Sequence, residues 1–94
     1  MDKTTKLNIL YDYYGNLLTK PEQSHFEDYY FHNLTLAEIA TNNNLSRNAV
    51  HKAIKSSELK LNTYEDKLKL FYKNNQIKQV IKDKELLNQL EDLI

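Results

Sequence analysis

The sequence of 94 residues contains no cysteine, one glycine and one proline. The absence of cysteine excludes disulfide bonds and cysteine-based metal sites. Glycine and proline are the residues that most often interrupt helices, so their scarcity favours helical structure. No segment shows the alternation of apolar and polar residues that is typical of strands. We therefore predict an all-α fold.

Long apolar segments are also missing. No apolar run approaches the roughly 20 residues that a membrane-spanning helix needs. The first residues, MDKTTKLN, lack the apolar core of a secretory signal. We therefore expect a cytoplasmic protein that does not insert into a membrane. A chain of 94 residues can form one modest core, so residues 1–94 are expected to be a single domain.

An overall excess of charge is missing too, because 13 basic residues balance 13 acidic ones. This balance conceals a gradient along the chain. Residues 1–46 carry three lysines and six acids, which is a net charge of −3. Residues 47–82 carry nine basic residues and three acids, a net charge of +6, and residues 83–94 return to −3. Only the central segment has the positive charge that a nucleic-acid-binding surface needs.

Residue patterns typical of catalysis or metal binding are absent from the sequence. His25, His32 and His51 are scattered, and the first two are seven residues apart, whereas helical metal-binding pairs are usually four apart. The chain has no glycine-rich phosphate loop and no serine or cysteine nucleophile motif. We therefore expect neither an enzyme nor a protein that holds a metal or cofactor.

The stretch Leu34–Lys55, LTLAEIATNNNLSRNAVHKAIK, carries the clearest structural signals. Thr35 and Glu38 have the spacing of a capping box, and Leu34 and Ile39 have that of a hydrophobic staple. Together these two signals predict a helix that begins directly after the threonine and runs over residues 36–43.

A turn and a second helix are predicted to follow. Asparagine tolerates the left-handed backbone of a helix end, so the run Asn42–Asn44 should end the first helix. Leu45 is expected to pack inward, and Ser46 can cap a helix from Arg47 to about Leu61. With small and apolar residues at positions 40 and 50, residues 35–61 have the pattern of a helix-turn-helix.

Two further helices are predicted before this unit. The first spans about Thr5 to Leu18, because its apolar residues recur three and four positions apart. Gly15 lies inside it at a cost of roughly 1 kcal/mol relative to alanine, so a kink or a close helix contact is expected there. The second runs from a capping box at Thr19 and Glu22 to about His32.

The chain contains seven tyrosines, at positions 11, 13, 14, 29, 30, 64 and 72. Exposed tyrosine rings can stack on nucleobases. We expect most of these rings to fill the core instead, with their hydroxyl groups at its rim.

After a predicted break at Asn62 and Thr63, the pattern is helical over about residues 64–94. The pair Asn74–Asn75 leaves open whether this tail is one long helix or two shorter ones. Its later apolar residues need cover, either from the domain or from a second copy in a homodimer through the tail. These residues are Ile77, Val80, Ile81, Leu87, Leu90 and Ile94.

The second helix of the helix-turn-helix presents a basic, polar face. Its predicted nucleic-acid-binding residues, together with one lysine near its end, are Arg47, Asn48, His51, Lys52, Lys55 and Lys60. Arg47 and Asn48 are the best placed to contact base edges, since arginine pairs with guanine and asparagine with adenine. The lysines would contact phosphates. The alternative for Arg47 is an ion pair with an acidic residue of the preceding helix.

Several short segments occur in a distinctive order along the chain. They are YGNLLT (14–19), YY (29–30), LTLAEIA (34–40), SRNAV (46–50), IK (54–55) and YEDKL (64–68). Over about residues 7–72 the chain resembles the YlxM family of small bacterial helix-turn-helix proteins, which are similar to region four of sigma factors. This resemblance implies an all-helical domain with a regulatory or accessory role in the signal recognition particle pathway of protein targeting.

Two hypotheses about function follow. In the first, the chain is an accessory factor of that pathway and binds particle RNA or DNA through its helix-turn-helix. In the second, the helix-turn-helix is only a scaffold, and the chain is a protein-interaction module that docks on the particle's protein subunit or its GTPase.

Overall fold

The computed structural model describes the backbone of residues 1–92 and the side chains of residues 1–82 and 84. In this part of the chain every regular element is helical, which confirms the all-α prediction. The elements are α1 (Lys3–Tyr14), the short 3-10 helix η1 (Gly15–Leu17), α2 (Lys20–Tyr30), α3 (Leu36–Asn43), α4 (Arg47–Leu68) and α5 (Leu70–Asp92). No helix in the described residues is long and apolar enough to cross a membrane.

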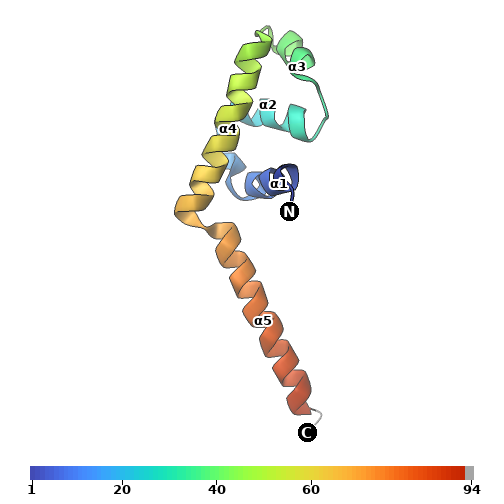
Figure 1. Cartoon of the computed structure of the whole chain (residues 1–94), viewed down its shortest axis with the longest axis vertical. Helices are drawn as coiled ribbons and strands as arrows, with labels where there is room; N and C mark the ends of the chain where they lie inside the picture. The colour runs from blue at the N-terminus through green and yellow to red at the C-terminus, as the bar shows by residue number, and fades with distance from the viewer. Residues whose placement is uncertain (93–94) are drawn as a thin grey trace.

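Helix α4 is the spine of the molecule. Figure 1 shows α3 beside its first turns, with α2 and then α1 packed further along it. Helix α5 contacts α1 and α4 only near its start and then extends away from the other helices. The molecule is therefore elongated, with principal extents of 68 × 25 × 20 Å.

The core consists of two clusters on the inner side of α4. The larger one joins α1, α2 and α4 through Leu7, Leu10, Tyr14, Leu18, Phe26 and Leu61. The smaller one joins α3 to α4 through Ile39, Ala40, Val50 and Ile54. Tyr30 packs against both clusters, so it connects the helix-turn-helix to the rest of the domain.

The predicted capping signals of the helix-turn-helix are confirmed. The Thr35 amide donates to Glu38 Oε1 and the Glu38 amide donates to Thr35 Oγ1, both over 3.1 Å, so the capping box is complete. Helix α3 begins and ends at the predicted residues. At the next helix start, the Ala49 amide donates to Ser46 Oγ over 3.0 Å. Because caps depend on neighbours only three residues apart, they are readable from sequence.

The turn between α3 and α4 follows the asparagine prediction, but one detail is wrong. Asn44 has a φ of 53°, and its amide and that of Leu45 donate back to Thr41 and Ala40. This pair of bonds closes the helix end. The side chain of Leu45 does not pack inward, since it is 44% exposed. The backbone bond of Leu45, not its side chain, is what stabilises the turn.

The first helix ends earlier than predicted. It stops at Tyr14, and Gly15 begins the 3-10 turn with an ordinary helical φ of −55°. The close contact expected at this glycine is present with the last turn of α1, because an added Cβ would lie 3.0 Å from the ring of Tyr11. That ring stacks on Phe26 at a centroid distance of 4.6 Å, so it has little freedom to move.

We therefore predict that Gly15→Ala destabilises the protein by about 1–3 kcal/mol, the usual cost of overpacking. Helix propensity alone would predict the opposite sign, a gain of up to about 1 kcal/mol. Urea denaturation followed by circular dichroism measures this difference. A stability equal to or above that of the wild type would show that the Tyr11 ring moves aside at no cost.

The predicted break at Asn62 and Thr63 is wrong. Both side chains donate to carbonyls four residues back, Asn62 Nδ2 to Glu58 O over 3.0 Å and Thr63 Oγ1 to Leu59 O over 2.8 Å. They are satisfied inside the helix, and α4 continues to Leu68.

The actual break is at Lys69, which has a left-handed φ of 54°. Lysine carries no sequence signal for this conformation. Asn74–Asn75 does not interrupt α5, so the tail is one helix from Leu70 to Asp92.

The joint between α4 and α5 depends on a buried tyrosine and a carboxylate. Tyr14 Oη donates to Glu65 Oε1 over 2.6 Å and accepts from the Leu70 amide over 2.9 Å. The Glu65 carboxylate also accepts from the Phe71 and Tyr72 amides, each over 3.2 Å. A carboxylate at these free N–H groups is favourable at a helix start. Burial, followed by the bond to Glu65, raises the pKa of Tyr14.

Among the residues whose side chains the structure describes, the later apolar residues of the tail are not covered by the domain. Ile77, Val80 and Ile81 are each more than half exposed. Leu87, Leu90 and Ile94 lie outside the residues whose side chains are described.

Candidate nucleic-acid interface

The first three turns of α4 have a buried side and an exposed side. Val50 and Ile54 anchor the buried side against α3 and are at most 2% exposed. The residues predicted for the exposed side are indeed exposed, and they are Arg47, Asn48, His51, Lys52 and Lys55. Residues three and four apart share a helix face, so one fixed surface presents these side chains. We call this surface the α4 face.

The alternative partner predicted for Arg47 is not observed. Within the residues that the structure describes, no ion pair links Arg47 to an acidic residue of α2. Its guanidinium group therefore remains available to an external anion.

One side of the α4 face borders a hollow of about 560 Å³. Its wall on α4 includes Arg47, His51 and Lys55. The opposite wall comes from three other helices, with Lys3 at the start of α1, Tyr29 near the end of α2 and Leu36 at the start of α3. Lys3 was not predicted, because only the packing of α1 brings it beside α4.

A nearly buried carboxylate lies in this hollow. Glu58 is 6% exposed, and its Oε1 lies 3.1 Å from Lys3 Nζ while its Oε2 lies 3.6 Å from Lys55 Nζ. The hydrogen bond and charge of Glu58 raise the pKa of Lys3. Burial, followed by the charge of Glu58, raises the pKa of Tyr30. Glu58 thus holds two lysines from different helices at the edge of the α4 face.

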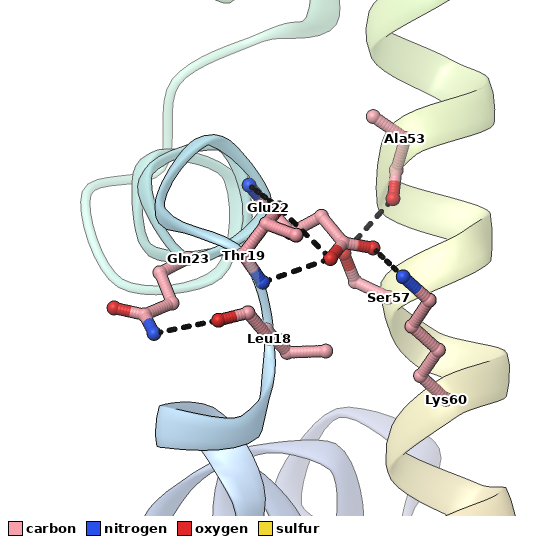
Figure 2. Close-up of polar contacts among 7 residues, drawn as sticks. All are labelled: Leu18, Thr19, Glu22, Gln23, Ala53, Ser57 and Lys60. Atoms are coloured by element: carbon pink, nitrogen blue, oxygen red, sulfur yellow. Dashed lines mark hydrogen bonds and ion pairs between the residues drawn. The ribbon is translucent and has the colours of Figure 1, made fainter.

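The structure does not bring Lys60 to this face. Lys60 follows Lys55 by five residues, and this step turns a helix by about 140°. Lys60 Nζ instead lies 2.7 Å from Glu22 Oε2 at the start of α2 (Figure 2). The other oxygen of Glu22 accepts from the Thr19 amide over 2.9 Å. Lys60 therefore fastens the capping box of α2 to α4.

This contact has a pH dependence. Partial burial opposes ionisation of Glu22, but the hydrogen bonds from Lys60 and Thr19 outweigh it and lower the pKa of Glu22. A carboxyl whose pKa is lower in the folded state stabilises the fold above its ordinary pKa. That contribution is lost as the pH falls through the lowered pKa.

We predict that Lys60→Met leaves nucleic-acid affinity within about twofold of the wild type, because a charge on another face is largely screened at physiological salt. The same change should make unfolding less dependent on pH in the acid range, since Glu22 loses its partner. Fluorescence anisotropy with labelled RNA and acid titration by circular dichroism measure the two effects. A tenfold loss of affinity would place Lys60 in the interface after all.

The tyrosine prediction is confirmed for most rings. Tyr14 is fully buried, and four others, at positions 11, 13, 30 and 64, pack against the larger core cluster. Tyr72, at 57%, and Tyr29, at 37%, are the exposed ones. Of these two, Tyr29 borders the hollow, which Tyr30 also lines.

The local charge of this region is positive. Lys3, Arg47, Lys52 and Lys55 are exposed here, and Lys3 and Lys55 pair with the carboxylate of Glu58. Each lysine or arginine that neutralises a phosphate releases counterions, which gives binding that weakens with salt. The arrangement can therefore hold a polyanion.

Comparison with known proteins supports the observed fold. A family model described as "Putative helix-turn-helix protein, YlxM / p13 like", UPF0122, matches residues 1–93. A UPF0122 protein of Malacoplasma penetrans is 47% identical over 89 residues, covering 92% of this chain and 83% of that protein. One of Geobacillus is 42% identical over 94 residues, covering 100% and 80%. One of Bacillus thuringiensis is 40% identical over 96 residues, covering 95% and 87%.

Proposed function

Because the chain belongs to the UPF0122 family of YlxM/p13-like helix-turn-helix proteins, we propose that it is a nucleic-acid-binding regulatory protein. The α4 face is the proposed contact surface. The observation that carries this proposal is the group of four exposed cations, Lys3, Arg47, Lys52 and Lys55, around the first half of α4. A non-enzymatic role is part of the proposal.

The geometry suits a helix that meets a groove with its N-terminal half. Arg47 and Asn48 are the first two residues of α4 and can reach base edges. Lys52 and Lys55, one to two turns later, are placed for phosphates. The buried contacts with α3 hold the backbone of α4 in place. The basic side chains are therefore carried by a helix that does not have to move when a ligand binds.

The small number of cations limits the expected affinity. Four contacts predict a logarithmic salt slope of about −3 to −4 and a dissociation constant of about 10⁻⁶–10⁻⁴ M for non-specific binding at physiological salt. Anisotropy titrations of labelled RNA and duplex DNA over a salt series test this expectation. Binding that does not change with salt would count against the proposal.

The likeness to YlxM further supports a place in the signal recognition particle pathway. We propose an accessory or regulatory role there, in the cytoplasm, with the particle RNA as one candidate ligand and DNA as the other. A pull-down from cell extract with and without ribonuclease tests this placement. Recovery of particle components that disappears with ribonuclease supports a role through the RNA.

A second candidate function is favoured by α5. Its exposed apolar side chains include Leu70, Tyr72, Ile77, Val80 and Ile81, all at least 44% exposed. Such a surface suits a protein partner, either the particle's protein subunit or GTPase, or a second copy of this chain. A complex that resists both salt and ribonuclease, and that is lost on truncation after Asn75, would favour this function over nucleic-acid binding.

A further inference from the structure

The hollow beside α4 has an aromatic wall that the core holds in place. The ring of Tyr29 meets Tyr30 edge-on, with centroids 5.0 Å apart and an interplanar angle of 88°. Tyr30 in turn packs on Phe26 at 4.6 Å, and Phe26 is fully buried. A ring supported in this way loses little freedom when a flat ligand stacks on it.

The polar groups of the hollow complement this wall. Each carboxylate oxygen of Glu58 forms an ion pair with one lysine, Lys3 or Lys55. The hydroxyl group of Tyr30 also bonds to Glu58. A carboxylate accepts about four hydrogen bonds, so it has room for two donors from a ligand once one of the exposed lysines turns away. The side chains of Lys3 and Lys55 are 68% and 53% exposed, and their charged ends can turn towards phosphates. The volume of about 560 Å³ lies within the usual range for small-ligand sites, roughly 300–1,000 Å³.

We infer that this hollow holds one unstacked guanine nucleotide of a structured RNA, with its base against Tyr29 and its donor edge on Glu58. Arg47, Lys3 and Lys55 then contact the flanking phosphates. This inference rests on the proposed function and names the ligand class of the same surface.

Guanine is selected by its hydrogen-bonding edge. Its N1–H and its amino group are adjacent donors, and they match the two oxygens of a carboxylate. Cytosine and adenine place an acceptor beside their amino group, and uracil places its single N–H between two carbonyls. A buried carboxylate repels such acceptors.

An unpaired nucleotide is favoured over a duplex for a steric reason. The hollow is lined by residues of α1, α2, α3 and α4, so a base has to leave its stack to enter. Loops and bulges of RNA supply bases in this state, and proteins commonly recognise them by stacking and by their Watson–Crick edges.

The test compares three labelled RNA hairpins that differ only in one bulged guanine, one bulged uracil or no bulge. Anisotropy at low salt should show the guanine hairpin binding about tenfold more tightly than the other two. Stacking on the aromatic ring provides the gain over the paired hairpin, and the hydrogen bonds to Glu58 provide the gain over uracil. Glu58→Gln should reduce the guanine-to-uracil ratio to about one. Tyr29→Ala should remove the advantage of the bulged guanine over the paired hairpin.

Tyr72→Ala is the matched control, because Tyr72 is the other exposed tyrosine and lies on α5, outside the hollow. It should leave the order of the three hairpins unchanged. Equal binding of all three hairpins by the wild type would overturn this inference but would leave the proposed nucleic-acid binding by the α4 face intact. A guanine preference that survives both Glu58→Gln and Tyr29→Ala would also overturn it. No binding of any hairpin would overturn this inference, and it would contradict the proposed function as well if duplex DNA also fails to bind.

Discussion

Replacing Arg47, Lys52 and Lys55 together by alanine is expected to weaken binding to RNA and DNA at low salt by about a hundredfold or more. Each side chain can form a charge-assisted hydrogen bond to a phosphate or base, worth roughly 1 kcal/mol or more, and 1.4 kcal/mol is a factor of ten. The logarithmic salt slope should fall by about one for each contact removed. Anisotropy titrations over a salt series measure both quantities.

A control with the same change in net charge is needed, because a lower net charge could by itself weaken binding to nucleic acid. Lys20, Lys60 and Lys67 serve this purpose. Lys60 pairs with Glu22 at the start of α2, and Lys67 follows it by two turns on the same side of α4. Alanine at these three positions should weaken binding by less than about threefold, since distant charges are screened. Equal losses of affinity in the two triple variants would show that binding is a general electrostatic attraction without a defined contact surface. An unchanged affinity in the variant at positions 47, 52 and 55 would contradict the assignment of the α4 face.

Tyr14→Ala is expected to destabilise the protein by about 3–5 kcal/mol, the usual cost of truncating a buried aromatic ring. Tyr14 is fully buried in the larger core cluster, and its hydroxyl group joins α4 to α5. A domain of this size has a total stability of only about 5–15 kcal/mol. The variant should therefore unfold at much lower urea concentrations than the wild type.

Tyr14→Phe separates packing from hydrogen bonding. It keeps the ring but leaves Glu65 and the Leu70 amide without the hydroxyl, which should cost about 1–3 kcal/mol. Hydrogen exchange at the Leu70 and Phe71 amides should accelerate more than exchange in α3, because the effect is centred on the joint. Tyr72→Phe, at an exposed ring, should change stability by less than about 0.5 kcal/mol. Wild-type stability in Tyr14→Phe would show that the joint does not depend on this hydroxyl group.

The parts of the fold that sequence predicted well are those fixed by near neighbours. The capping boxes at Thr19 and Thr35 involve residues three positions apart, and both are present. The face that carries Arg47 and Lys52 follows from helical periodicity alone. Lys60 was predicted as a phosphate contact beyond this face, and its ion pair with Glu22 of α2 depends on a tertiary contact that periodicity does not show.

The parts that sequence missed depend on tertiary contacts or on unmarked backbone conformations. Nothing in the sequence marks Lys69 as the break between α4 and α5. Asparagine and threonine at positions 62 and 63 are typical of a break, but their side chains bond to carbonyls inside α4. The hollow arises because Lys3 and Tyr29 reach α4 from other helices. Counting charges along the sequence identifies the basic segment, but it cannot show that Lys3 and Tyr29 lie beside α4.

The role of α4 as the contact surface is tested most directly by amide chemical-shift mapping. The ¹⁵N-labelled protein is titrated with an RNA hairpin at low salt, and the shift of each assigned amide is followed. The largest changes are predicted along residues 46–56 and at Lys3 and Thr4, with little change around Glu22 and Lys60. Changes confined to α5, with none along the first half of α4, would contradict the account and favour a scaffold role for the helix-turn-helix.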